Sequence, residues 1–309
     1  MQSTHSTSSR NAAISVEKLS KSYGSRRSIS DLTFEVPVGA ICGFVGPNGS
    51  GKSTTMRALL SLISTDSGEA LIFGESVKNP ARYLHRVGSM IEAPALYPAL
   101  TGRENLQLFA SLAGIRNLDH RSLLARVGLG DRANSTFKSY SLGMKQRLAI
   151  ATALIGEPEL LILDEPMNGL DPTGIAEIRL LLQEFAASGR TIFISSHLLR
   201  ELEALCDYFV MIRDGKTIFS GGSANLAARN GGELVVRPEF SVDLGKLHQL
   251  ALEKGLSSTI VGQKLQISEA GELAADFNRW ASELEITVVE LTQNLGSLEQ
   301  RYFQMESEA

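Results

Sequence analysis

The sequence predicts an α/β protein with a mixed sheet core, a helical subdomain and a small C-terminal α+β domain. Three observations lead to this fold class. Strand-like and helix-like segments alternate through residues 14–231, and a mostly helical stretch interrupts them at about 93–157. The last segment, 232–309, has a shorter strand and helix order of its own. Residues 1–13 are polar and rich in serine and threonine, which predicts a disordered tail rather than a signal peptide.

Composition is typical of a globular chain with an acidic balance. Of the 309 residues, 43% are hydrophobic and 21% are charged, which suits a packed core. The net charge of -4 argues against nucleic acid as a partner, because binding phosphate backbones needs a surplus of lysine and arginine. Cys42 and Cys206 form neither a disulfide framework nor a zinc-site spacing. No apolar run reaches the roughly 20 residues of a membrane helix, so crossing a membrane would need another chain.

The first elements of the expected domain read as strands. "ISVEKLSKSY" and "SISDLTFEVP" alternate apolar and polar residues, as half-buried strands do. "AICGFV" is continuously apolar, which favours a strand covered on both faces. A helix, "STTMRALLSLI", follows a glycine-rich loop. In the helical stretch, Thr101 and Glu104 form a capping box and Gly114 is a C-cap. "RSLLARVG" and "SLGMKQRLAIATALIG" are further helices.

Strands return after the helical stretch. "LLIL" and "TIFIS" flank the helix "TGIAEIRLLLQEFAASG", the strand, helix, strand unit of a parallel sheet. "YFVMIRDGKTIFSG" predicts a hairpin at Asp214-Gly215. Residues 232–309 then follow a βαββαβ order, typical of a ferredoxin-like domain, with a hairpin at Gly262-Gln263 and a last helix, "SLEQRYFQM". Within this segment the helical spacing of three apolar residues indicates core rather than a cofactor site: Leu273, Phe277 and Trp280.

The stretch "GPNGSGKST" carries the first chemical signal. It matches G-x-x-x-x-G-K-[ST] between an expected strand and an expected helix, so its backbone N–H groups can form an anion site. Lys52 can reach the β- and γ-phosphates, and the Ser53 hydroxyl can bind Mg²⁺. A plain glycine turn is the alternative, and the lysine and hydroxyl argue against it. The expected nucleotide contacts here are Gly46, Asn48, Gly49, Gly51, Lys52, Ser53 and Thr54.

A pair of acidic residues ends the strand "LLIL" and supplies the second signal. Asp164 would hold Mg²⁺, directly or through its waters, and Glu165 would point toward an attacking water. Paired acids usually form a solvated turn. These two end a buried strand, where an unpaired charge is costly, so a metal site is favoured.

With these motifs in place, the chain resembles the ATP-binding subunit of an ABC transporter over residues 14–222. The resemblance implies the P-loop NTPase fold of an ABC cassette, with "GPNGSGKST" as Walker A and "LLILDEP" as Walker B. "YSLGMKQRL" stands at the signature, and "NGLD", which ends at Asp171, at the D-loop. "SSH" ends in the switch histidine, His197, and Tyr23 lies where the family stacks an aromatic ring on adenine.

The resemblance also implies a mechanism. Two subunits pair head to tail with ATP between Walker A of one and the signature of the other, where Ser141 and Gly143 meet the γ-phosphate. Asp171 counts among the nucleotide contacts, and His197 orders the water with Glu165. Taken alone, a tyrosine in a strand is usually a packing residue, and His197 would be a satisfied histidine at a strand end. The position of Tyr23 and the other motifs favour adenine stacking and the switch role instead.

Three positions depart from the family pattern. Glu92 stands where the family places a glutamine near Mg²⁺, Leu142 replaces the first glycine of the signature, and Met144 replaces its glutamine. "IEAPALYP", "TGRENL" and "YSLGMKQRL" resemble the branch of bacitracin-resistance and lantibiotic-immunity exporters. That branch implies a separate integral-membrane permease and a cargo such as a peptide antibiotic. We expect a homodimer at the cytoplasmic face of the membrane, and pairing with a sister subunit stays open.

Two alternatives stay open from the sequence. The first is an ABC ATPase that acts on ribosomes or DNA, which usually has two cassettes, a long coiled-coil insertion or zinc cysteines; this chain shows none of these. The second is a regulatory ATPase whose C-terminal domain senses a ligand or supports the dimer.

Overall fold

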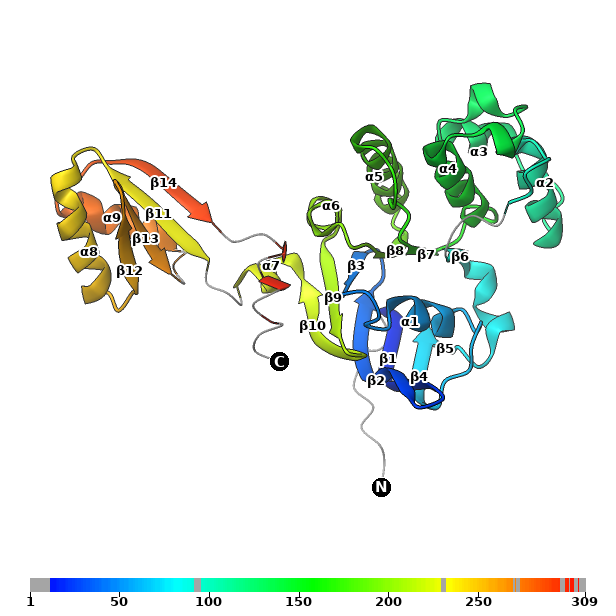
Figure 1. The fold of residues 1–309 in the computed structure, drawn as a ribbon, viewed down its shortest axis with the longest axis horizontal. Helices are drawn as coiled ribbons and strands as arrows, with labels where there is room; N and C mark the ends of the chain where they lie inside the picture. Colours follow the sequence, from blue (N-terminus) through cyan, green and yellow to red (C-terminus); the bar gives the residue numbers. More distant parts are fainter. Residues whose placement is uncertain are drawn as a thin grey trace. The chain divides into compact units, whose positions relative to one another are not determined.

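The computed structural model describes residues 12–91, 96–228, 232–268, 270, 273–294, 298–299, 301–302 and 305. The chain divides into two compact units, residues 1–220 and 221–309, and Figure 1 labels their elements. This division falls earlier in the chain than the boundary expected at residue 232. We call the two parts the N-terminal unit and the C-terminal unit.

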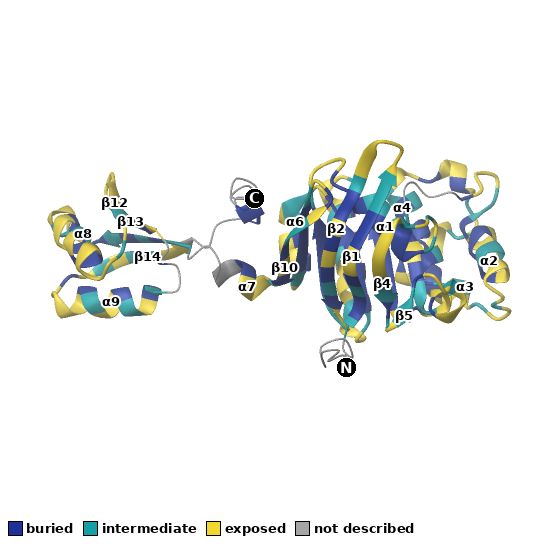
Figure 2. Ribbon diagram, turned by 90° about the horizontal axis from the view of Figure 1, so that it is seen from below, coloured by how far each residue is buried: buried dark blue, intermediate teal, exposed yellow. Residues whose placement is uncertain are grey.

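Two sheets build the N-terminal unit. The first is antiparallel, in the order β2-β1-β4-β5, and consists of β1 (Ala12–Tyr23), β2 (Arg26–Pro37), β4 (Ser67–Ile72) and β5 (Glu75–Ser76). Buried and exposed residues are mixed along β1 and β2, as half-buried strands require (Figure 2). β1 begins at Ala12, inside the segment expected to be a tail.

The second sheet has the order β10-β9-β3-β8-β7-β6. Its strands are β3 (Ile41–Val45), β6 (Val87–Met90), β7 (Leu160–Asp164), β8 (Thr191–Ser195), β9 (Tyr208–Arg213) and β10 (Lys216–Gly222). From β9 to β6 the neighbouring strands are parallel. β3, β7 and β8 are buried along their whole length, as their continuous apolar runs predict. Ligands of parallel sheets bind beyond the carboxyl ends of the strands, where the loops after β3, β7 and β8 lie.

An aromatic cluster joins the two sheets. Phe34 of β2 packs against Phe44 of β3 and Phe193 of β8, with ring centroids 4.8 to 5.9 Å apart. Because these rings fasten the antiparallel sheet onto the parallel one, they fix the loop after β1 relative to the loop after β3. The helices of this unit are α1 (Lys52–Leu59), α2 (Gly102–Leu112), α3 (His120–Arg126), α4 (Leu142–Ala153), α5 (Pro172–Ala187) and α6 (Leu199–Leu205).

Local signals in the sequence account for several element ends. Thr101 Oγ1 accepts from Glu104 N at 3.2 Å while Glu104 Oε2 accepts from Thr101 N at 2.8 Å, so the capping box is confirmed. Asp214 and Gly215 have φ of 48° and 76°, the left-handed pair of a tight hairpin between β9 and β10. Single 3₁₀ turns occur at Pro80–Arg82, Leu84–Arg86, Gly130–Arg132, Phe137–Ser139 and, in the C-terminal unit, Ser241–Asp243.

The C-terminal unit contains an antiparallel sheet in the order β12-β13-β11-β14. Its elements are α7 (Ser223–Ala228), β11 (Glu233–Pro238), α8 (Leu244–Glu253), β12 (Ser258–Val261), β13 (Lys264–Ser268), α9 (Ala274–Glu283) and β14 (Val288–Asn294). From β11 to β14 this is a ferredoxin-like arrangement. Phe277 is fully buried in the core, with Leu273 and Trp280 packed against it. The expected last helix, at 297–305, lies partly outside the described residues.

Candidate functional site

Close approach of backbone makes the glycines of the loop after β3 necessary. A Cβ on Gly51 would lie 2.6 Å from Ser28 O, and a Cβ on Gly46 would lie 2.6 Å from Ile212 O. Gly51 also caps α1 with φ of 106°, a conformation that residues with side chains rarely adopt. The loop is therefore a tight cradle whose shape tolerates no side chain at these positions.

Lys52 is buried at the start of α1 and folds back on the cradle. Its Nζ donates to Gly46 O at 2.6 Å and to Pro47 O at 3.2 Å. Burial lowers the pKa of the Lys52 ammonium, while Glu165 and Asp164 act in the opposite direction. The side chain thus places a partly desolvated positive charge beside the loop.

The ends of β7 and β8 bring the two acids and a serine together. Asp164 pairs in register with Ser195 on the neighbouring strand. Ser195 Oγ donates to Asp164 Oδ1 at 2.5 Å and accepts from Glu165 N at 3.0 Å. Ser195 therefore orients the Asp164 carboxylate directly and holds Glu165 through the Glu165 backbone N–H.

Glu165 and His197 form a pair just beyond these strands. Glu165 has φ of 50°, and its Oε2 lies 2.8 Å from His197 Nδ1. The same oxygen accepts from His197 N at 3.3 Å. The Glu165 side chain is 24% exposed and that of His197 49%, so the pair is open to solvent and to a ligand. A strained backbone at a solvent-facing acid is typical of functional sites.

These residues surround one cleft of about 480 Å³. It is lined by Tyr23, Arg26, Ser28, Asn48, Gly49, Gly51, Lys52, Ser53, Thr54, Asp164 and Glu165. The structure therefore gathers at one place most of the nucleotide contacts expected from sequence. His197 does not line the cleft but contacts Glu165, which does. Gly46 belongs to the loop and does not line the cleft either. Glu92 lies outside the described residues.

The remaining expected contacts lie away from this cleft. Ser141 caps α4 and accepts from Met144 N at 3.3 Å, and Asp171 caps α5 and accepts from Gly174 N at 3.0 Å. Neither they nor Gly143 is among the lining residues. Within one chain, the signature and the phosphate loop therefore do not form a single site.

Sequence reasoning missed Arg26, Ser28 and Ser195. Arg26 Nη2 lies 3.3 Å from the position of a Cβ on Gly49, and Ser28 Oγ donates to Thr54 Oγ1 at 3.0 Å. Among the described residues, no carboxylate pairs with the Arg26 guanidinium. The signal for Arg26 is an arginine pair at the start of β2, and only the strand register tells which of the two faces the loop.

The donor set suits Mg²⁺ that arrives with a phosphate ligand. Ser53 and Asp164 line the same cleft, and Ser195 occupies only one Asp164 oxygen. Mg²⁺ favours few protein ligands and keeps water and phosphate oxygens. The described residues contain no cluster of three or more His, Cys, Asp or Glu side chains that could hold a metal ion.

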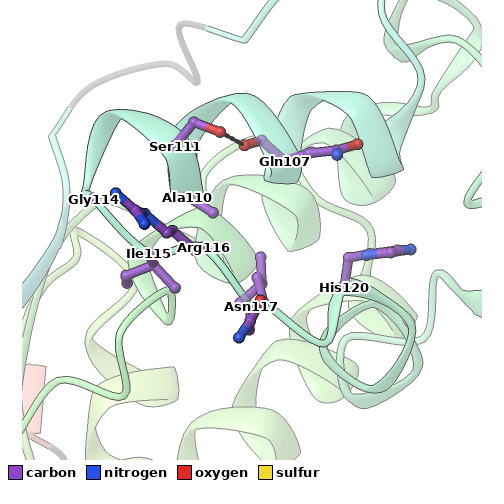
Figure 3. Close-up of a pocket in the computed structure, with 9 residues that line it drawn as sticks. Gln107, Ala110, Ser111, Gly114, Ile115, Arg116, Asn117 and His120 are labelled. Carbon is purple, nitrogen blue, oxygen red and sulfur yellow. Dashed lines mark hydrogen bonds between the residues drawn. The ribbon is translucent and has the colours of Figure 1, made fainter.

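A larger, open hollow of about 720 Å³ lies in the helical part, between the end of α2 and the start of α3 (Figure 3). Arg116, Asn117 and His120 belong to its lining. It contains neither the phosphate loop nor a carboxylate for a cation, so it is not the nucleotide site. No helix among the described residues is long and apolar enough to cross a membrane.

Comparison with known proteins agrees with the geometry. The family model described as "ABC transporter" matches residues 29–168. The chain is 43% identical over 216 residues to the lantibiotic transport ATP-binding protein SrtF of Streptococcus pyogenes, which covers 69% of this chain and 93% of that protein. It is 39% identical over 272 residues to the bacitracin transport ATP-binding protein BcrA of Enterococcus faecalis, covering 86% and 87%.

Solved structures give the same result. An ATP-binding subunit of an ABC transporter superposes with a TM-score of 0.63 at 32% identity, over 70% of this chain and 92% of that one. An ATP-binding cassette of an ABC transporter in its ADP conformation superposes with a TM-score of 0.63 over 69% and 92%. At 22% identity, this second match is evidence for the fold alone.

Proposed function

This chain belongs to the ABC transporter family and is an ATP-hydrolysing subunit, and from that premise we propose that it powers export of a peptide antibiotic or a similar amphipathic compound. The relatives' names, lantibiotic transport and bacitracin transport, support this cargo class. In this proposal the chain binds at the cytoplasmic face of the membrane to a separate permease, which handles the cargo. No observation on the described residues favours action on ribosomes or DNA.

The Glu165–His197 pair beside the phosphate loop is the observation that carries the proposed mechanism. Glu165 Oε2 lies 2.8 Å from His197 Nδ1. In the imidazolium form both ring nitrogens donate, so Nδ1 donates to the Glu165 carboxylate and Nε2 donates to a γ-phosphate oxygen. The carboxylate is then oriented to take a proton from an attacking water. Mg²⁺, held by Ser53 and Asp164, would neutralise charge that develops on the phosphates.

The separation of the signature from the cleft supports a site shared between two copies. Ser141 and Gly143 open α4, and the helix N-terminus favours an anion. In the head-to-tail dimer, they bind the γ-phosphate of the nucleotide held by the partner. Lys52 exchanges its bonds to Gly46 O and Pro47 O for phosphate oxygens, and loss of the γ-phosphate on hydrolysis lets the dimer open.

Two substitutions test the catalytic roles. Glu165→Gln keeps the shape of the side chain but removes its basicity, so we expect ATP to bind normally and turnover to fall about 10² to 10⁴-fold. Lys52→Ala removes a phosphate contact, so we expect calorimetry to show greatly weakened ATP binding. Full turnover in Glu165→Gln would contradict the assigned base, and unchanged turnover in Lys52→Ala would contradict the site itself.

A separate experiment tests the cargo. The chain and the permease that co-purifies with it are placed in proteoliposomes, and transport of bacitracin is followed with and without ATP. ATP-dependent movement that disappears with Glu165→Gln is the expected result. Movement of other compounds but not of peptide antibiotics would overturn the cargo class while leaving the ATPase role intact.

A further inference from the structure

The start of α4 packs against the D-loop, residues 168–171, and each of the two segments contributes one leucine and one glycine to the contact. A Cβ on Gly169 would lie 2.9 Å from Leu142 Cδ2. In the reverse direction, Leu170 Cδ2 lies 3.7 Å from the position of a Cβ on Gly143. Each segment thus places a leucine over a glycine of the other.

A third contact extends the connection. Arg147 Nη1 of α4 lies 3.1 Å from Glu177 Oε2 of α5, and the Arg147 side chain is only 19% exposed. Asp171 caps α5, so the D-loop is continuous with that helix (Figure 1). The signature helix is therefore connected to the D-loop at its first turn and to α5 one turn further along.

This arrangement accounts for the leucine in the signature. Leu142 is 49% exposed, so about half of the residue is covered, and the D-loop contributes to that cover. Its space exists because position 169 has no side chain. Gly169 also has φ of 74°, so both the backbone and the neighbouring leucine favour glycine.

We propose that Leu142 and Gly169 are positioning residues, matched in size, which make the signature and the D-loop of one chain move as a unit. This inference rests on the proposed function, because it matters where Ser141 and Gly143 meet the nucleotide of a partner copy. A side chain at 169 displaces the Leu142 side chain from this contact, which weakens the connection between the first turn of α4 and the D-loop. Binding of ATP to the chain's own phosphate loop is left intact.

The test is a double-mutant cycle in the full chain carrying Glu165→Gln. Light scattering measures the ATP concentration for half-maximal dimer formation in the parent, Gly169→Ala, Leu142→Ala and the double variant. For a coupling of about 1 kcal/mol, we expect Gly169→Ala to raise that concentration about fivefold when Leu142 is present. With Leu142→Ala, Gly169→Ala should leave that concentration nearly unchanged. Affinity of the dilute monomer for a fluorescent ATP analogue should stay the same.

Gly189→Ala is the matched control. Gly189 has φ of 81° and no atom within 4 Å of an added Cβ, so alanine there carries the backbone cost without a neighbour. We expect it to lower the melting temperature and leave dimer formation unchanged. An equal effect of Gly169→Ala in both backgrounds, or none in either, would overturn the inference.

Failure of the proposed function would look different. In that case the Glu165→Gln parent would bind ATP and never dimerise, whatever residue stands at 142. The size match would then be judged from melting temperatures of the same four proteins. Non-additive shifts would support the contact, and additive shifts would exclude it.

Discussion

Buried polar side chains distinguish the two units of this protein. In the N-terminal unit, Lys52 is buried at the start of α1, and Asp164 and Ser195 are buried at the ends of parallel strands; each contacts another functional group or the phosphate loop. In the C-terminal unit, Arg301 is the one buried charged or polar residue among those described. Its core of Leu234, Val236, Phe277 and similar residues is apolar.

The difference shows where each unit's stability and chemistry come from. Burying a charge is costly unless it is paired, so the N-terminal unit retains such groups where they bind something. Apart from Arg301, the charged residues described in the C-terminal unit are at least partly exposed, and among them Glu290 bonds both Arg237 and Lys264. Paired surface charges of this kind contribute little to folding.

The two units each contain a histidine with a hydrogen-bonded partner, and replacing each with alanine should give the largest contrast. His197 bonds Glu165, whereas His248 Nδ1 lies 2.8 Å from Ser258 Oγ. We expect His197→Ala to lower steady-state ATP turnover by about 10²-fold, because the base loses its orienting partner. His248→Ala should leave turnover within experimental error. Equal losses would mean that both units take part in the chemistry.

Two adjacent arginines within the N-terminal unit provide a finer contrast. Arg26 lines the cleft, whereas Arg27 Nη2 bonds Ser20 Oγ at 3.4 Å and lies 4.0 Å from Asp31. We expect Arg26→Gln to weaken ATP binding by about five- to tenfold, because a charge-assisted bond to phosphate is lost. The change should be smaller for ADP and AMP in calorimetry.

Arg27→Gln is the control for that experiment, because it removes the same charge on the neighbouring residue. Its nucleotide affinities should match those of the natural chain. If both variants lose affinity equally, the effect comes from net charge, and Arg26 makes no specific contact.

Acid should produce the smallest effect, which Glu290 of the C-terminal unit illustrates. Lys264, and then Arg237, hold the pKa of Glu290 below its ordinary value by hydrogen bonding to the carboxylate. A lowered folded-state pKa adds stability above the unfolded-state pKa, and this is lost as pH falls through the folded-state value. Glu290→Gln should therefore slightly reduce the melting temperature at pH 7 and have no effect near pH 2. A larger difference at the lower pH would contradict this linkage.

Prediction from sequence succeeded where a few neighbouring residues decide the structure. The capping box at Thr101, the hairpin at Asp214-Gly215 and the buried strands β3, β7 and β8 all follow from local patterns. The sequence did not predict β4, β5 and β6 as separate strands, because they are short and their apolar and polar residues do not alternate clearly. The sequence also did not indicate which face of the sheet the Arg26 side chain is on, because the pairing of β1 with β2 shifts register between Lys21 and Ser22. A shifted register reverses which side chains face the cleft.

The sequence by itself determined the phosphate loop, the acids that follow β7 and the order of the elements, because spacing, backbone freedom and apolar periodicity act within a few residues. Only the tertiary structure decided that Ser195 bonds Asp164, that Arg26 overlies Gly49 and that Leu142 fills the space beside Gly169. Each of these contacts joins segments from different strands, loops or helices. Their distances depend on how sheets and helices pack, and no local pattern records that.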